Sequence, residues 1–120
     1  TYGSNPLAMA VGNAVLDVME KPGFLENIRK VSALLKDGLQ ELVNSYPNIF
    51  SEVRGRGLLL GVQVKPAIAI MEMVERLRAR RLLMTAAEGN VLRIVPPLVI
   101  EEQHVQDAIA IMQGVCKEWS

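Results

Sequence analysis

The sequence predicts an α+β fold, a small and mostly antiparallel sheet with helices packed on one face. The 120 residues are enough for one domain with its own core. Apolar residues recur at helical spacing in four segments and at strand spacing in four others. The strand segments come as two pairs, each joined by a short turn and separated from the other pair by a helix, an order typical of an α+β layer.

The first helix is expected to begin at Asn5 and Pro6. An asparagine side chain caps a first turn well, and a proline is tolerated at the first helical position because its missing N–H is not needed there. The helix should run to about Glu20, where residues 21–23, Lys-Pro-Gly, break it. Apolar side chains cover most of its circumference, so we expect it to be buried on most sides.

A second, amphipathic helix should follow and end near Tyr46. Its polar residues lie on one side, which predicts a helix with one wet face. Its inward face is predicted to consist of Leu25, Ile28, Leu35, Leu39 and Leu42.

Residues 49–64 contain two β-rich runs hinged at Gly55 and Gly57, which predicts a hairpin. Gly61 removes a side chain inside the second strand, either because another backbone or a ligand comes close there or because of a plain bulge. A third helix is expected from about Ala67 to Arg81. Its basic end is read as a solvated last turn that complements the helix dipole.

A second strand pair is expected at residues 82–86 and 91–95, and Glu101 and Glu102 should begin the last helix. The inner face of that helix is predicted to be Val105, Ala108, Ile109, Met112 and Cys116.

Composition excludes several classes of function. Thirteen basic and thirteen acidic residues cancel, so nothing favours nucleic acid or an anionic membrane as a partner. A hydrophobic fraction of 50% indicates that some apolar surface packs against another segment or subunit. Cys116 is the only cysteine, which predicts a reduced, cytoplasmic setting. The start at Thr1 shows neither a methionine nor a signal peptide, and we expect the chain to begin inside something longer or to be processed.

Common catalytic constellations are missing from the sequence. His104 and Cys116 are the only imidazole and thiol, so no metal site is predicted. There is no Gly-x-Ser-x-Gly or phosphate-binding Gly-x-x-x-x-Gly-Lys pattern. No lysine looks desolvated enough for Schiff-base chemistry, and His104 is expected to be exposed.

Arg93 is the only charged residue between Val91 and Ile100. In a strand, Val91, Arg93 and Val95 would share one face, while the residues between them share the other. A guanidinium between two valines is costly to desolvate unless a carboxylate or phosphate meets it, which indicates a buried anion site. The spacing alone favours the other interpretation, an arginine at a strand end whose head stays in water.

The opening TYGSNP is a second candidate site. Backbone N–H groups at a helix N-terminus can hold a phosphate when a threonine or serine lies nearby, here Thr1 and Ser4. The same residues also suit an ordinary loop before a helix cap.

Three motifs in order, TYGSNPLAMAVGNAVLDVM, EVRGRGLLLGVQV and NVLRIVPPLVIEE, resemble the C-terminal third of class III pyridoxal-phosphate aminotransferases. The wording is most similar to the acetylornithine branch, although the ornithine, succinylornithine and 4-aminobutyrate branches share these motifs. The resemblance implies a fold type I homodimer whose large domain binds the cofactor. Residues 1–20 would be a connecting helix and interface segment, and residues 21–120 the C-terminal small domain.

The resemblance also implies roles for the candidate residues. Thr1 would reach the phosphate of the pyridoxal phosphate in the partner subunit, and Ser4 stands where the family usually has a glycine. Arg93 would meet a substrate carboxylate or a glutamate of the large domain. The family's catalytic lysine lies upstream, so no catalytic residue is expected in this chain and it should be inactive alone. The whole enzyme would transfer an amino group from N-acetylornithine to 2-oxoglutarate, a 2-oxo acid. A free-standing carboxylate-binding module and a dimerisation domain are the alternatives.

Overall fold

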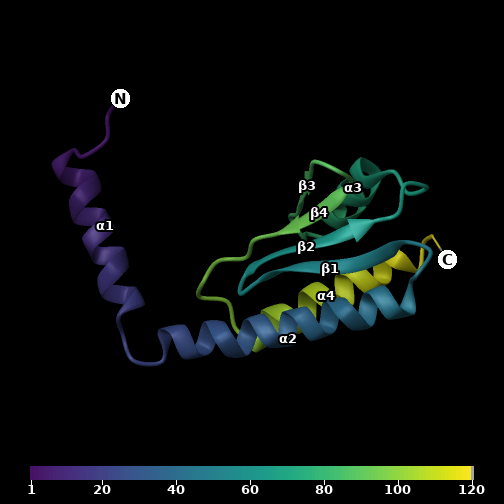
Figure 1. Cartoon of the computed structure of the whole chain (residues 1–120), viewed down its shortest axis with the longest axis horizontal. Helices are drawn as coiled ribbons and strands as arrows, with labels where there is room; N and C mark the ends of the chain where they lie inside the picture. Colours follow the sequence, from purple (N-terminus) through teal and green to yellow (C-terminus); the bar gives the residue numbers. More distant parts are fainter. Residues whose placement is uncertain (120) are drawn as a thin grey trace.

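A computed structural model describes residues 1–119 and shows one four-stranded antiparallel sheet with helices (Figure 1). The elements in chain order are α1 (Pro6–Met19), α2 (Phe24–Ser45), β1 (Phe50–Arg56), β2 (Leu59–Val64), α3 (Ile70–Ala79), β3 (Thr85–Ala87), β4 (Val91–Ile94) and α4 (Glu102–Cys116). The strand order is β1-β2-β4-β3, with every neighbouring pair antiparallel. The predicted α+β class is confirmed.

The first hairpin turns where its glycines allow it. Gly55 and Gly57 have φ angles of 114° and 56°, in the region that side chains disfavour. A Cβ on Gly55 would lie 2.1 Å from the carbonyl oxygen of Leu59, so no larger residue fits there. The second hairpin turns through Gly89 and Asn90, whose φ angles are 78° and 63°.

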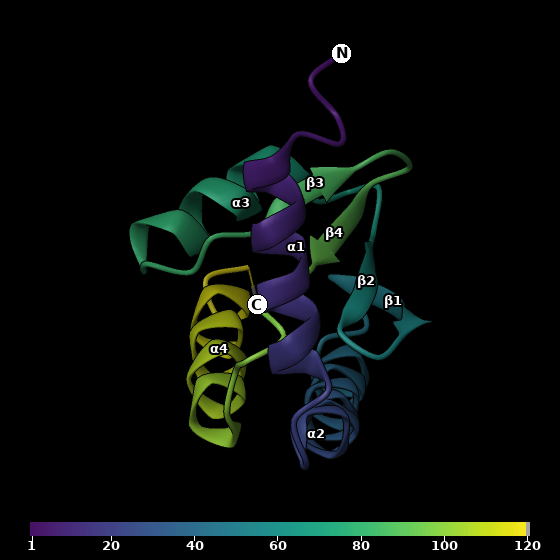
Figure 2. The same cartoon turned by 90° about the vertical axis from the view of Figure 1, so that its left-hand side faces the viewer.

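Helices α2, α3 and α4 pack on one face of the sheet and enclose the core (Figure 2). Leu39 of α2 and Leu92 of β4 are fully buried at 0% exposure. The largest other side chains of this core are Phe50, Met73, Leu77 and Met112. The remaining face of the sheet is not covered by any helix of the described residues.

The second hairpin begins later than predicted. Residues 82–84 are not a strand, because α3 ends in a Schellman motif that includes Leu82. The Leu82 N–H donates to the carbonyl of Leu77 at 3.0 Å, and the Arg81 N–H donates to the carbonyl of Arg78 at 2.9 Å. Arg81 has the positive φ of 66° that this motif requires. The apolar residues 82–84, which the sequence places in a strand, therefore lie at the end of α3 and in the segment that follows it.

The expectation that α1 is buried on most sides is wrong for this chain. Its start is as predicted, since Asn5 Oδ1 accepts a hydrogen bond from the Ala8 N–H at 2.8 Å. None of its residues is buried, however, and α1 extends away from the sheet (Figure 1). A helix that is apolar around most of its circumference is expected to pack against other parts of a protein. Almost no residue of 1–119 packs against α1. Leu25 is likewise 52% exposed and not part of the inward face of α2.

The basic end of α3 is not simply solvated, as the sequence suggested. Arg76 and Arg80 both form ion pairs with Glu118, which follows α4. The Arg76 guanidinium also lies 4.2 Å from the ring centre of Trp119. Its pKa is raised, first by the hydrogen bond to Glu72 and then by Glu118. The end of the chain is thereby fastened to α3.

Within residues 1–119, no helix has the length and apolar character needed to cross a bilayer.

Candidate functional site

Arg93 stands on the uncovered face of the sheet, in the middle of a row across all four strands. Its register partners are Gly61 of β2 and Thr85 of β3, and Gly61 pairs in turn with Arg54 of β1. Arg93 is exposed, whereas Leu92 and Ile94 on either side are buried. The predicted alternation of β4 is confirmed.

The side chain of Arg93 is exposed within residues 1–119, so this part of the chain does not itself supply the anion that the sequence predicts. Among residues 1–119, Arg93 has no hydrogen bond or ion pair. The nearby Arg54 differs, because its Nε lies 3.1 Å from a Glu52 oxygen and its Nη2 donates to Gln63. An anion for Arg93 must therefore come from outside the described residues.

Gly61 has no side chain beside Arg93 on this face, and Val91 takes up the place that one would need. A Cβ at Gly61 would lie 2.9 Å from Cγ1 of Val91, closer than real side chains approach. The sheet has no bulge at this position, since the only irregularity of β1 and β2 lies between Phe50 and Glu52. The group that comes close to Gly61 within residues 1–119 is the side chain of Val91, where the sequence suggested a backbone, a ligand or a bulge.

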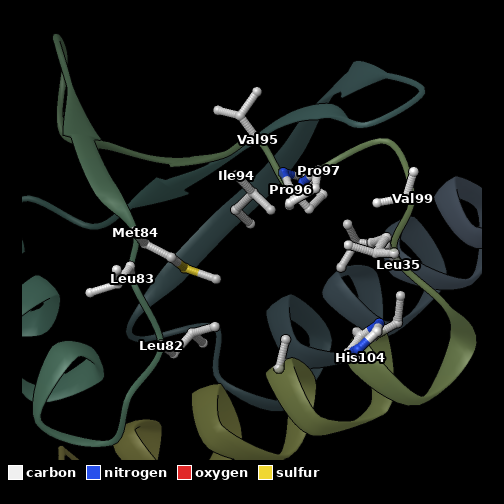
Figure 3. A pocket seen from close by; sticks show the side chains of 13 residues that line it. Leu35, Leu82, Leu83, Met84, Ile94, Val95, Pro96, Pro97, Val99 and His104 are labelled. Atoms are coloured by element: carbon white, nitrogen blue, oxygen red, sulfur yellow. The ribbon is translucent and has the colours of Figure 1, made fainter. Parts of the chain in front are cut away.

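An apolar cavity of about 480 Å³ lies beside the end of β4 (Figure 3). Met84 and Ile94 point into it, and Pro96 and Pro97 form one wall. Val95, two residues after Arg93, also lines it. The cavity contains one titratable side chain, His104, so it suits an apolar partner surface and offers no nucleophile.

His104 is exposed as predicted, but it has a structural task that the sequence did not reveal. Its Nδ1 accepts a hydrogen bond from the Glu101 N–H at 2.9 Å, while the Glu101 side chain accepts from the His104 N–H. This reciprocal pair is a capping box at the start of α4. The usual signal for it is a glutamate or glutamine three residues after the cap, and here a histidine takes that place.

Thr1 and Ser4 are exposed at the free end of α1, far from the sheet in Figure 1. Asn5 shapes this loop, because its Nδ2 donates to the Tyr2 carbonyl at 2.8 Å while its Oδ1 caps α1. Ser4 has a φ of 63°, a conformation that favours glycine. The structure does not bring Thr1 and Arg93 together within one chain.

These donors fit part of a phosphorylated cofactor. Hydroxyl groups at Thr1 and Ser4 beside a helix N-terminus suit a phosphate. No lysine of the chain is buried, so no amine here is desolvated for a covalent role.

Comparison with known proteins decides the family. The model of the family described as Aminotransferase class-III matches residues 1–116. The chain belongs to the class III aminotransferase family. It is 42% identical to acetylornithine aminotransferase 1 of Bradyrhizobium diazoefficiens over 97% of this chain, and 46% identical to the acetylornithine aminotransferase of Agrobacterium fabrum over 95%.

Solved class III aminotransferase structures share this fold. The N-acetylornithine aminotransferase of Stenotrophomonas maltophilia matches 98% of the chain with a TM-score of 0.85 at 30% identity, over 32% of its own length. The ornithine aminotransferase of Plasmodium yoelii matches all of it with a TM-score of 0.90 at 25% identity, also over 32% of its length. The chain spans about 28% of the length of the curated relatives it matches.

Proposed function

We propose that this chain is part of an acetylornithine aminotransferase, which moves an amino group from N-acetylornithine to 2-oxoglutarate. The observation that carries the proposal is the identity of 42–46% to proteins of that name over 91–97% of the chain. Ornithine aminotransferases among the structural relatives make ornithine the competing donor.

Arg93 is the residue of this chain proposed to bind substrate. It is exposed and has no ion pair among residues 1–119, and it lies opposite Gly61 on the face of the sheet that no helix of these residues covers. A guanidinium binds a carboxylate through two parallel N–H···O bonds, which fixes both the position and the orientation of the ligand. Both the proposed donor and 2-oxoglutarate carry such a carboxylate.

The proposed cofactor is pyridoxal phosphate, which supplies the electron sink for amino transfer when it is bound. Thr1 would hold the cofactor phosphate of a partner subunit through its hydroxyl, with Ser4 nearby. The separation of Thr1 from Arg93 within one chain supports this sharing between two subunits. No residue of this chain is proposed to be catalytic, and the chain alone should not turn over substrate.

The proposed partners are a large domain and a second copy of the whole protein. The exposed apolar surface of α1 and the cavity beside β4 both need a cover. The relatives have more than twice as many residues outside the matched region as within it, because the match covers about 28% of their length.

The test is Arg93→Lys in the full-length protein. A point charge replaces a planar fork, so we expect the KM for 2-oxoglutarate to rise about tenfold or more. Arg29→Lys, a change of the same kind at an exposed position of α2, is the control and should leave KM unchanged. An unaltered KM in Arg93→Lys would contradict the proposed role.

The accessibility of Arg93 also favours a second candidate, a carboxylate-binding module that works by itself. Titration calorimetry of the 120-residue chain with 2-oxoglutarate separates the two. The aminotransferase proposal expects no measurable heat without the large domain, and saturable binding lost in Arg93→Lys would favour the module instead.

A further inference from the structure

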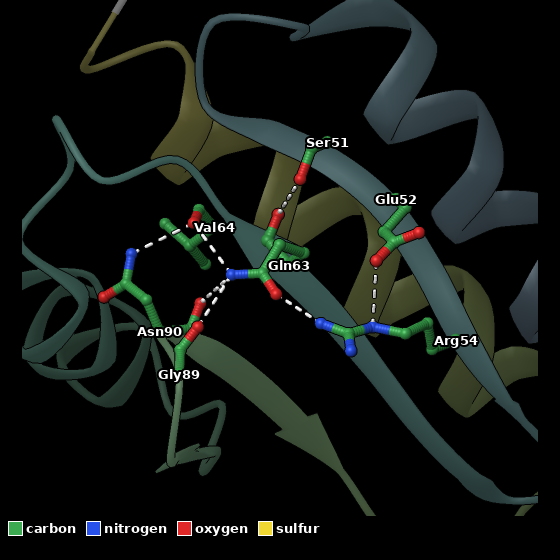
Figure 4. A network of polar contacts seen from close by, with 7 residues as sticks. All are labelled: Ser51, Glu52, Arg54, Gln63, Val64, Gly89 and Asn90. Carbon is green, nitrogen blue, oxygen red and sulfur yellow. Dashed lines mark hydrogen bonds and ion pairs between the residues drawn. The ribbon is translucent and has the colours of Figure 1, made fainter.

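The turn between β3 and β4 is tied to the end of β2 by two amide side chains (Figure 4). Gln63 Nε2 donates to the carbonyls of Gly89 at 2.8 Å and Asn90 at 3.2 Å. Asn90 Nδ2 donates in return to the carbonyls of Val64 at 3.0 Å and Lys65 at 3.2 Å. Two side chains thus add to a ladder that already includes the bond from the Val64 N–H to the Asn90 carbonyl at 3.0 Å.

The other end of the Gln63 side chain connects this turn to β1. Gln63 Oε1 accepts a hydrogen bond from Arg54 Nη2, and Arg54 is itself paired with Glu52 at 3.1 Å (Figure 4). Gln63 of β2 therefore links β1 to the turn between β3 and β4 through one amide group. The bond also holds the Arg54 guanidinium beside Gln63, which lies two residues after Gly61 in β2.

The position of Arg93 depends on the register of a very short strand. β4 has four residues and β3 has three, so few backbone hydrogen bonds fix them. A slip of one residue would turn Arg93 into the core, which the apolar pattern of β4 forbids. A slip of two residues would leave every side chain of β4 on its present face of the sheet but would move Arg93 by about 7 Å along the strand direction. Such a slip would break the bonds that Asn90 Nδ2 donates to the carbonyls of Val64 and Lys65 and would move Gly89 away from Gln63, so these side-chain bonds favour the observed register.

We propose that Gln63 is a positioning residue for Arg93: with Asn90 it locks the β3–β4 hairpin in the register that places Arg93 opposite Gly61. The inference rests on the proposed function, in which Arg93 receives a carboxylate. Gln63 itself does not touch the substrate.

The main test is Gln63→Glu in the full-length enzyme. A carboxylate cannot donate to the carbonyls of Gly89 and Asn90, yet it can still accept from Arg54, so only the hairpin side of the link is lost. We expect the KM for 2-oxoglutarate to rise about threefold to tenfold, with kcat changed less than twofold. Asn90→Asp removes the reciprocal donor in the same way and should act in the same direction.

Gln40→Glu is the matched control. Gln40 makes an exposed hydrogen bond to Asn44 on α2, and the same chemical change there should leave KM as it is. Thermal unfolding of each variant gives the readout of a purely structural role, which would lower the midpoint without altering KM.

Three results would overturn the inference. They are an unchanged KM in both Gln63→Glu and Asn90→Asp, an equal rise in Gln40→Glu, and failure of Gln63→Glu to fold, which would make Gln63 a determinant of the whole domain. Arg93→Lys keeps the two proposals apart. If Arg93→Lys raises the KM and the amide variants do not, positioning by Gln63 is wrong while the proposed function stands. If Arg93→Lys leaves the KM unchanged, the proposed function itself is wrong.

Discussion

Gly61→Ala tests whether close packing, and not chain flexibility, accounts for the glycine in the middle of the sheet. Alanine in a strand gains about 0.5–1 kcal/mol over glycine, because it loses less conformational entropy on folding. The new methyl group would lie 2.9 Å from Val91 Cγ1, however, and a valine side chain is stiff about χ1. Overpacking of this kind costs about 1–3 kcal/mol. We therefore expect a net loss of about 1 kcal/mol.

A double-mutant cycle with Val91→Ala isolates the clash. Val91→Ala removes the opposing methyl group, so Gly61→Ala in that background should become stabilising by about 0.5 kcal/mol. The coupling free energy between the two positions would then be about 1.5 kcal/mol. Urea denaturation followed by circular dichroism measures the free energy of unfolding of all four proteins, with an unchanged m-value confirming a comparable denatured state.

The same loss for Gly61→Ala in both backgrounds would refute this reasoning. That result would mean that the methyl group meets something other than Val91, or that backbone conformation alone requires the glycine.

Three further outcomes are expected. Burial raises the pKa of the Cys116 thiol to about 12, so the thiol loses its proton at a lower pH in the unfolded chain than in the folded one. The free energy of unfolding should therefore fall as pH rises from about 9 towards 12. Denaturation at several pH values measures this, and Cys116→Val should show a smaller fall. Glu118 forms partly exposed ion pairs with Arg76 and Arg80, so Glu118→Gln should lower the urea midpoint slightly at low ionic strength. The difference in midpoint from the wild type should shrink in high salt, which screens such pairs. Equal differences at both salt concentrations would contradict this. The exposed apolar side chains of α1 should make copies of the isolated chain associate. Val15→Asp should then shift the mass in light scattering towards the monomer value of 13.2 kDa, while the control Asn13→Asp should not. A wild-type chain that is already monomeric at high concentration would disprove association through α1.

Long, strongly periodic elements could be predicted from the sequence, and short ones could not be bounded. The core positions Leu35, Leu39 and Leu42 of α2 follow directly from a helical apolar pattern and are buried. The start of β3 was missed because Leu82 is apolar in either setting. What decides its conformation is the left-handed Arg81, whose φ of 66° leaves no trace in an apolar pattern.

The candidate site divides in the same way. Alternation along β4 gave the face of Arg93 correctly, because strand geometry is local. The link from Gln63 to Asn90 joins residues 27 positions apart, and the pair Arg76–Glu118 joins residues 42 apart. Side-chain hydrogen bonds over such separations follow from the tertiary fold and have no periodic signature.

The exposure of Arg93 and its proposed role as an anion receptor are compatible once the neighbouring surface is considered. The cavity beside β4 and a second apolar groove along α1 share Val99, so one apolar surface runs from α1 to the end of β4. The cavity is lined by Leu35 of α2 and Val105 of α4, on the helix side of the sheet, so a body that covers this surface shields Arg93 where it also extends past Val95 onto the opposite face. Electrostatic attraction strengthens as water is removed, so a carboxylate bound there would be held far more strongly than at the open sheet face. The covering body would then create the low polarity in which an unpaired guanidinium is costly. The bound carboxylate would offset that desolvation cost.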